Sequence, residues 1–285
     1  MGCATTIVIP CYNEERRLDA AAFERFLTGP PVARLLFVND GSRDGTLELL
    51  KALERRHPRR CDVIDLSTNV GKAEAVRCGL RYALEHGADL VGFWDADLAT
   101  PLDAIDEFVR VLERRRGIDV VIGSRLPLLG HAILRQPRRA ALGRVFARAA
   151  SWTLGVPVRD TQCGAKLFRA TPWTVAAFAR PFRTRWIFDV EILARLAQLG
   201  VRSGGPQLGE CVYELPLEDW RDVAGSKLRL RDFLKAPREL ASIWRRYLSP
   251  LQSRPPEIAA PPAVTLPLPG AVQTAPANDE VRRAA

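Results

Sequence analysis

Two carboxylates at the end of an apolar run could hold a metal ion. Asp95 and Asp97 directly follow Leu90–Trp94, a run with the length of a buried strand. Residues two positions apart on an extended chain project to the same side. Mg²⁺ and Mn²⁺ favour such carboxylates and keep their other positions for water and substrate phosphate. The alternative for this pair alone is a turn or a helix cap.

Two earlier loops have residue types that suit a nucleoside. One is Pro10–Glu14, which contains Tyr12, and the other is Asn39–Thr46, which contains Asp40. An aromatic ring can pack against a base, and a carboxylate can accept its N–H groups. The alternative is that the second loop is only a strand-to-helix turn and Tyr12 a core ring. No dinucleotide fingerprint follows a strand, and Gly71-Lys72 lacks the earlier glycine of a phosphate loop.

Alternating strands and helices must position these residues. Short β-rich runs alternate with amphipathic stretches, and this alternation predicts a largely parallel α/β sheet. Asp44, Asn69 to Gly71 and Pro101 signal the starts of three helices. Ligands of open α/β sheets bind at the carboxyl ends of the strands, where the loops above lie. The predicted strands are 5–9, 35–38, 63–66, 90–94 and 120–122, and the predicted helices are 46–56, 72–85 and 102–115.

Three later segments extend the pattern. They are Asp160–Phe168, Arg185–Glu191 and Trp220–Lys227. Together with the earlier loops, and in this order, they resemble family 2 glycosyltransferases over about residues 4–240. Within that family the chain resembles the group of dolichyl-phosphate glucosyltransferases and polyprenyl-phosphate mannosyltransferases. Its residues in the later segments resemble those of the glucosyl members more closely.

The resemblance implies a GT-A fold, which is Rossmann-like, with a nucleotide-sugar donor, a Mg²⁺ or Mn²⁺ ion and a polyprenyl phosphate acceptor. The expected donor is UDP-glucose. Many mannosyl members have Gln where this chain has Ala99, so a third metal ligand is not evident. The implied roles are catalysis for Asp97, Asp189, Arg125 and Lys227; nucleotide-sugar binding for Pro10, Tyr12, Glu14, Asp40, Gly71, Lys72 and Asp95; acceptor-phosphate binding for Arg125, Ser226 and Lys227; and metal binding for Asp95 and Asp97.

A polyprenyl phosphate is already an anionic nucleophile at neutral pH, because its second pKa is about 6. Direct displacement at the anomeric carbon with inversion then needs no general base. Asp189 and Glu191 open an apolar helix and could bind sugar hydroxyls, or act as base for a hydroxyl acceptor. For Glu191 a helix cap is an equal alternative.

The charge predicts an anionic partner. The 42 Lys and Arg residues outnumber 33 Asp and Glu residues, giving a net charge of +9. Basic residues are interleaved with large apolar ones in Leu126–Arg159 and Leu228–Leu248, as in helices that lie on a membrane surface, although an ordinary solvated face is the alternative for each. With no signal peptide or spanning run evident, we expect a cytoplasmic protein that contacts the membrane only peripherally.

The composition predicts one folded domain and a tail. Residues 1–249 form the expected glycosyltransferase domain, ending in amphipathic helices. Residues 250–285 contain eight prolines and no apolar period, which is typical of a disordered tail. The six cysteines form no CxxC pair, so neither a zinc site nor a disulfide framework is expected.

Other functions remain open at this point. A family 2 transferase acting on a saccharide or protein hydroxyl would require a base such as Asp189. A nucleotidyltransferase would share the sheet and metal but needs a Gly-rich, Lys-bearing first loop. A non-catalytic binding module for nucleic acid could use the basic stretches, but the chain has no recognised nucleic-acid motif, and we expect no nucleic-acid partner.

Overall fold

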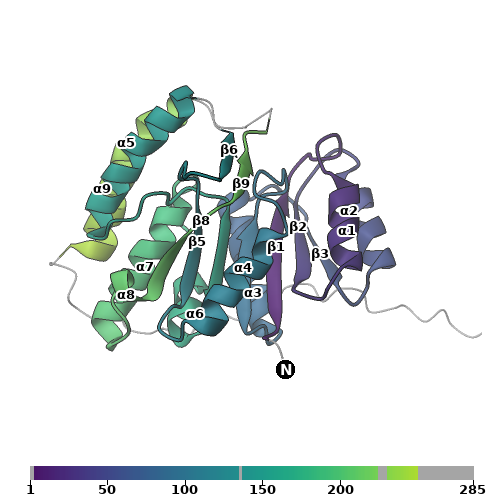
Figure 1. Ribbon diagram of the computed structural model, residues 1–285, viewed down its shortest axis with the longest axis horizontal. Coiled ribbons are helices and arrows are strands. Elements are labelled where there is room, and N and C mark those ends of the chain that lie inside the picture. Colours follow the sequence, from purple (N-terminus) through teal and green to yellow (C-terminus); the bar gives the residue numbers. More distant parts are fainter. Residues whose placement is uncertain (1–2, 135–136, 224–229, 250–285) are drawn as a thin grey trace, which may run out of the picture.

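A computed structural model describes residues 3–134, 137–223 and 230–249. Its main feature, within these residues, is a seven-stranded sheet of order β3-β2-β1-β4-β7-β5-β8 (Figure 1). The predicted parallel α/β architecture is therefore confirmed, and all five predicted strands belong to this sheet. The strands are β1 (Thr5–Cys11), β2 (Arg34–Asp40), β3 (Cys61–Leu66), β4 (Leu90–Trp94), β5 (Val120–Ser124), β7 (Ala165–Arg169) and β8 (Val212–Pro216).

Strand β7 is the exception to the parallel order. It runs antiparallel between β4 and β5, pairing Trp94 with Ala165 and Ile122 with Lys166. The sequence analysis did not predict this strand. Its insertion brings the segment that precedes it, residues 160–164, to the carboxyl end of β4.

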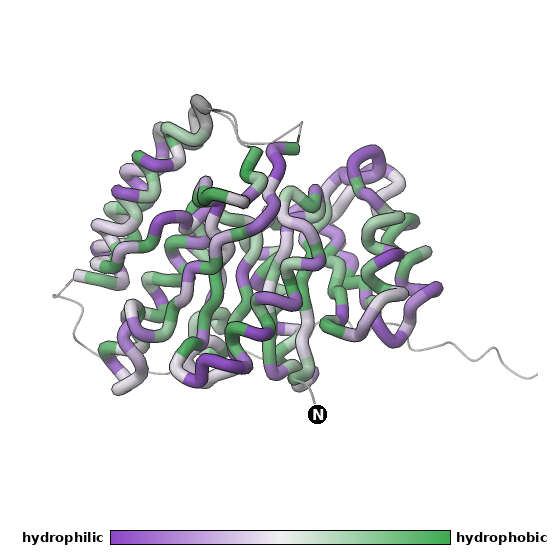
Figure 2. Tube along the Cα trace, viewed as in Figure 1, coloured by the Kyte–Doolittle hydropathy of each residue, from purple (hydrophilic) through white to green (hydrophobic). Residues whose placement is uncertain are grey.

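Helices cover both faces of the sheet. One core lies between the sheet and α3, α6 and α7, and the other lies between the sheet and α1, α2 and α4. Figure 2 shows the hydrophobic central strands between helices of mixed polarity. The helices are α1 (Ala20–Thr28), α2 (Thr46–Arg56), α3 (Lys72–Glu85), α4 (Ala104–Arg114), α6 (Pro172–Phe178), α7 (Phe188–Ser203) and α8 (Leu208–Cys211).

The three predicted helix starts are close to those observed. Asp44 accepts hydrogen bonds from the backbone and hydroxyl of Thr46, the first residue of α2. Helix α3 begins at Lys72 as predicted, after Gly71 in the left-handed region at φ 94°. Helix α4 begins two residues later than predicted, because Leu102 and Asp103 form a turn.

Two of the remaining helices lie at one end of the molecule. Helices α5 (Pro137–Leu154) and α9 (Leu230–Ile243) lie side by side there, and a π-helical turn, η1 (Trp244–Leu248), follows α9 (Figure 1). Strands β6 (Ala132–Leu134) and β9 (Asp219–Arg221) form a small parallel sheet. Each of the two basic stretches thus contains a helix, but Leu126–Arg159 also contains β6, and its helix α5 is only weakly amphipathic, unlike α9. The tail from residue 250 lies outside the described residues.

Two further expectations concern the whole chain. None of the helices in the described part is long and apolar enough to cross a membrane. The six cysteines are all free thiols in the structure. Whether residues 1–249 form one folding unit stays a prediction.

Candidate active site

The site lies where β2, β1 and β4 end side by side. Cys11, the last residue of β1, pairs with Asn39 of β2. The two loops that follow are joined by hydrogen bonds: Asn13 N–H donates to Ser42 Oγ at 2.9 Å, and Glu14 N–H donates to Thr46 Oγ1 at 2.8 Å. The loops that contain Tyr12 and Asp40 therefore form one wall, as predicted from their positions after adjacent strands.

Asp40 fixes the turn that begins α3. Its Oδ1 accepts from Val70 N–H at 2.7 Å and its Oδ2 from Gly71 N–H at 3.0 Å. Burial raises the pKa of the Asp40 carboxyl, while these two N–H groups act in the opposite direction. Gly71 must lack a side chain here, because of its positive φ. Asp40 thereby places Lys72 at the edge of the site.

Asp95 and Asp97 occupy the turn after β4. Asp97 Oδ1 accepts from Ala99 N–H at 3.1 Å, and the guanidinium of Arg17 lies 3.8 Å from Asp97 Oδ2. Asp95 is ion-paired with the ammonium group of Lys72. Burial raises the pKa of the Asp97 carboxyl, and the negative charge of Asp95 raises it further. The two carboxylates thus lie close together and are only partly exposed to solvent.

The backbone of the 160–164 segment supports Asp95. Asp95 N–H donates to Gly164 O at 3.1 Å, and a Cβ on Gly164 would stand 2.0 Å from Asp95 Oδ2. Only glycine fits this close approach. The glycine before β7 is therefore explained by its contact with the carboxylate pair.

Asp189 enters the site from the first turn of α7. Its Oδ1 accepts from Lys166 Nζ at 2.5 Å, and its Oδ2 accepts from Gln162 Nε2 at 3.4 Å. Lys166 is fully buried and also donates to Cys163 O at 2.6 Å. Burial raises the pKa of the Asp189 carboxyl, against the opposing charges of Lys166 and Lys72.

Arg125, which follows β5, is engaged by another carboxylate. Its Nε and one terminal nitrogen each donate to an oxygen of Asp160 at 2.6 Å, and its backbone N–H donates to Asp160 Oδ2. Its guanidinium carbon lies 5.2 Å from the Trp220 ring centroid. Burial alone would lower the pKa of Arg125, but Asp160 outweighs this and raises it. These hydrogen bonds hold Asp160 in place, and with it the start of the 160–164 segment, which contains Gln162.

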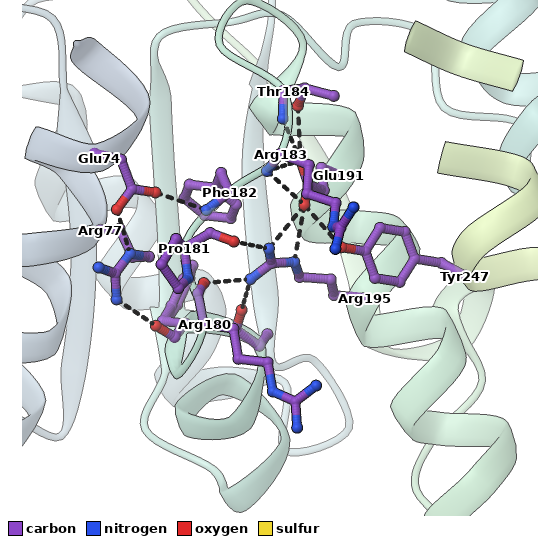
Figure 3. A network of polar contacts seen from close by, with 12 residues as sticks. Glu74, Arg77, Arg180, Pro181, Phe182, Arg183, Thr184, Glu191, Arg195 and Tyr247 are labelled. Carbon is purple, nitrogen blue, oxygen red and sulfur yellow. Dashed lines mark hydrogen bonds and ion pairs between the residues drawn. The ribbon is translucent and has the colours of Figure 1, made fainter. Parts of the chain in front are cut away.

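Glu191 does not face the site, in contrast to one hypothesis from the sequence. It is wholly buried and accepts hydrogen bonds from Arg183 N–H, Thr184 N–H and Thr184 Oγ1. It also accepts from Arg195 Nη2 at 2.7 Å and from the Tyr247 hydroxyl at 2.9 Å (Figure 3). Burial would raise the pKa of the Glu191 carboxyl, but Arg195 and the loop donors lower it overall.

The same network holds the whole loop between α6 and α7. Arg195 donates to the carbonyls of Ala177, Arg180 and Pro181, and Glu74 of α3 accepts from Phe182 N–H at 2.6 Å (Figure 3). This loop carries Arg185. A terminal nitrogen of Arg185 lies 3.5 Å from where a Cβ on Gly71 would stand, beside Asp40.

The structure brings most of the predicted site residues together at one edge of the sheet. These are Pro10, Tyr12, Glu14, Asp40, Gly71, Lys72, Asp95, Asp97 and Asp189. Arg125 instead pairs with Asp160. Ser226 and Lys227 lie outside the described residues. The individual roles of all these residues stay predictions.

Sequence reasoning did not single out Lys166, Arg17 or Arg185. Lys166 appeared only as one letter of a segment, although a lysine between the apolar residues Ala165 and Leu167 indicates a buried partner. Arg17 and Arg185 are among many arginines of the chain, and only the fold shows that they lie beside Asp97 and Gly71.

The residues present fit a divalent cation. Asp95 already pairs with a cation, the Lys72 ammonium, on which the charges of Asp97 and Asp189 also act. No group of three His, Cys, Asp or Glu side chains within the described ranges could hold a metal ion alone. Two carboxylates with further positions left for water and phosphate agree with the usual coordination of Mg²⁺ and Mn²⁺.

Comparison with known proteins identifies the family. The model of the family described as Glycosyl transferase family 2 matches residues 6–170. A dolichyl-phosphate beta-glucosyltransferase of Drosophila melanogaster is 33% identical over 263 residues, covering 85% of this chain and 75% of the relative. A protein of the same designation from Trichomonas vaginalis is 31% identical, covering 84% and 70%.

Solved structures agree on the fold. Glucosyl-3-phosphoglycerate synthase from Mycobacterium tuberculosis has a TM-score of 0.58 at 19% identity, covering 85% of this chain and 79% of that one. The same enzyme with Mn²⁺, UDP and glucosyl-3-phosphoglycerate gives 0.54 at 20% identity, covering 85% and 78%. A Pyrobaculum calidifontis mannosyltransferase with GDP-Man and Mn²⁺ gives 0.53 at 16% identity, covering 86% and 63%. The expected GT-A fold is confirmed.

The family model spans more than half of the chain, and the two relatives above extend the match through α7 and beyond. The carboxylates, the ordered loops and the fold agree with this assignment. The chain is a glycosyltransferase and belongs to glycosyl transferase family 2.

Proposed function

We propose that this protein transfers glucose from UDP-glucose to the phosphate group of a polyprenol such as dolichyl phosphate. One observation carries the proposal: relatives at 31% and 33% identity, matched over most of both chains, are dolichyl-phosphate beta-glucosyltransferases. The positions of Asp40, Lys72, Asp95 and Asp97 around one edge of the sheet support it, because a nucleotide diphosphate needs base, phosphate and metal contacts together.

The nucleotide that we propose for the sugar donor is uridine diphosphate. The Mycobacterium tuberculosis enzyme was crystallised with UDP and Mn²⁺, whereas the mannosyltransferase was crystallised with GDP-Man. The fold alone therefore accommodates either base. The glucosyl relatives make UDP-glucose the donor that we propose.

Asp95 and Asp97 are the residues that would hold Mg²⁺ or Mn²⁺. When bound, such a cation supplies positive charge that stabilises the diphosphate leaving group. Asp97 keeps its carboxylate oriented through the Ala99 N–H. Glu14 and Arg17, which lie 3.6 Å apart, extend this charged edge toward the first loop.

The reaction that we propose is a single displacement. An oxygen of the lipid phosphate forms a bond to the anomeric carbon, and the bond from that carbon to the diphosphate breaks with inversion. Because the acceptor is already an anion, positioning and charge neutralisation account for the rate. Asp189, held by Lys166, is placed to accept hydrogen bonds from sugar hydroxyls.

The residues that we propose for binding the acceptor phosphate are Arg125, Ser226 and Lys227. The contact between Arg125 and Asp160 limits the part that Arg125 can take, since its Nε and one terminal nitrogen already donate to that carboxylate. Arg125 then acts mainly by ordering residues 160–164.

We also propose that the protein meets the cytoplasmic face of a membrane through α5. Leu142, Val145 and Trp152 lie on one side of this helix and are 43%, 69% and 89% exposed. Arg144 and Arg148 are exposed between them. Exposed apolar residues interleaved with arginine suit a surface of anionic lipid, where the acceptor's phosphate would lie.

A second candidate is transfer to a hydroxyl. It is favoured by the burial of Asp189, which raises the pKa of its carboxyl, since a base for a hydroxyl acceptor must take up a proton. A matched pair of acceptors separates the two: polyprenyl phosphate and the polyprenol without phosphate.

The test offers UDP-glucose and Mn²⁺ to the full chain with each acceptor, and follows the glucosylated lipid. The proposal predicts product from the phosphate only, and an Asp189→Asn variant that keeps part of this activity. Product from the alcohol, abolished by Asp189→Asn, would replace the proposal with the second candidate.

A further inference from the structure

The ammonium group of Lys72 is paired with one of the site's carboxylates. It is ion-paired with Asp95, and the charges of Asp189 and Asp97 also act on it. Lys72 remains 45% exposed, and Asp95 and Asp97 are 32% and 28% exposed. The carboxylates are therefore reachable from solvent, and the lysine side chain has room to turn away from them.

We propose that Lys72 is a built-in competitor of the divalent cation, displaced from Asp95 when the cation binds and then captured by the donor's diphosphate. The competition follows from Coulomb's law. A divalent cation on Asp95 and an ammonium group on the same carboxylate would lie within a few ångströms of each other, where like charges repel strongly in a partly buried site. Both cannot keep their full contact with Asp95.

The charge of the cluster explains why nucleotide and metal would bind together. With all groups ionised, the carboxylates of Asp95, Asp97, Asp189 and Glu14 face Lys72, Lys166 and Arg17, which leaves one net negative charge. A divalent cation alone makes the cluster net positive and leaves Lys72 without a partner. A diphosphate supplies the missing negative charge. Each ligand therefore increases the affinity for the other, and reciprocally.

The position of Lys72 in the fold makes it suitable for this exchange. It is the first residue of α3, so a phosphate that meets its ammonium group also lies near the unpaired N–H groups of the helix start. Asp40 holds Val70 and Gly71, so the backbone before Lys72 is fixed and only the side chain needs to move. The buried Lys166 cannot substitute for it, because its ammonium donates to Asp189 and to Cys163 O.

The inference rests on the proposed function only in that the donor carries a diphosphate. The test measures the direct binding of Mn²⁺ with and without UDP, and uses the electron paramagnetic resonance signal of the free ion to do so. The full chain is compared with Lys72→Met, and with Lys72→Arg, which keeps the charge. The matched control is Lys51→Met, which removes a surface lysine that is paired with Glu54, away from the site.

We expect Lys72→Met to bind Mn²⁺ alone about ten-fold more tightly than the unmodified protein does, within the usual range of coupling between sites. UDP should then increase the affinity for Mn²⁺ much less in this variant than in the unmodified protein. Lys72→Arg and Lys51→Met should both resemble the unmodified protein, and circular dichroism should show that all variants fold.

Equal or weaker Mn²⁺ binding by Lys72→Met would overturn the inference, and so would an unchanged effect of UDP. Neither result involves glucose or lipid. The inference can thus fail while transfer to polyprenyl phosphate is observed, and it can succeed while that acceptor proves wrong.

Discussion

Lys166 and Asp189 form an ion pair in the interior, 2.5 Å apart, although they come from β7 and α7. The Lys166 side chain is fully buried and that of Asp189 is 8% exposed. The Phe93 ring centroid lies 5.2 Å from the ammonium nitrogen. The pair fixes the carboxylate that α7 presents to the site, so Lys166 is a positioning residue.

Replacing Lys166 by Met should leave Asp189 buried without its partner. We expect the free energy of unfolding at pH 7 to fall by about 3–5 kcal/mol, as in other broken buried pairs. The pKa of Asp189, already raised by burial, should rise further. Because the folded protein would then bind this proton at a higher pH than the unfolded chain does, the loss of stability should become smaller as the pH is lowered through the raised pKa of Asp189.

Urea unfolding of Lys166→Met, Asp189→Asn and the double variant gives the test. The double variant should lose less stability than the sum of the two single losses, because a neutral Asn at position 189 no longer requires the charge of Lys166. Additive losses would show that the two groups do not depend on each other.

Glu191 should matter for stability rather than for chemistry. Its pKa is lowered in the folded state from its ordinary value of 4.5, so its contribution is complete above that value and is lost as the pH falls through the lowered pKa. We expect Glu191→Gln to lower the free energy of unfolding at pH 7 by about 3 kcal/mol or more, since Arg195 stays buried.

The control is Glu113→Gln, which changes an exposed carboxylate of α4. The difference between Glu191→Gln and the unmodified protein should shrink in unfolding experiments near pH 4. A difference that stays constant from pH 7 to pH 3 would contradict the assigned role of the Glu191 charge.

Arg185 should contribute to donor binding, because the network around Glu191 holds it beside Gly71 and Asp40. We expect Arg185→Gln to weaken UDP binding about ten-fold, the usual effect of one charge-assisted hydrogen bond. Calorimetry with UDP and Mn²⁺ measures it.

Arg183→Gln serves as the matched control, since Arg183 is exposed on the same loop. Its variant should bind UDP as the unmodified protein does. Equal weakening by both substitutions would indicate a general effect of surface charge rather than a contact of Arg185.

The proposed membrane contact of α5 depends on apolar burial. Trp152→Glu should reduce binding to vesicles with anionic lipid about ten-fold, since burying a large apolar side chain contributes roughly 1.5–3 kcal/mol. The control is Val201→Glu, which changes an apolar residue of α7 that is 85% exposed. If both variants sediment with vesicles equally well, α5 is not the contact surface.

Strands β1 to β5 and helices α2 to α4 could be predicted because the strands are mostly apolar and the helices have recognisable starts, whereas β8, which is also parallel, was not predicted. Leu90–Trp94 and Lys72–Glu85 have the predicted bounds. The edge at which the site lies also follows from the pattern, since parallel strands place their carboxyl ends together.

Strand β7 and the buried pairs could not be predicted in this way. Ala165–Arg169 contains two basic residues, and the burial of Lys166 depends on Asp189, which lies 23 positions away. Glu191 is bonded to Tyr247, 56 positions away. Residue types and periodicity describe local preference, whereas these contacts arise only when the chain is packed.

The measurement that tests the central claim most directly is transfer of glucose from UDP-glucose to polyprenyl phosphate by the full chain with Mn²⁺, with mass spectrometry of the lipid. The account predicts a glucosyl phosphate lipid that requires both metal and lipid phosphate. It also predicts at least a 100-fold lower rate for Asp97→Ala, the order of loss when charge stabilisation is removed. Absence of this lipid, or its undiminished formation by Asp97→Ala, would contradict the account.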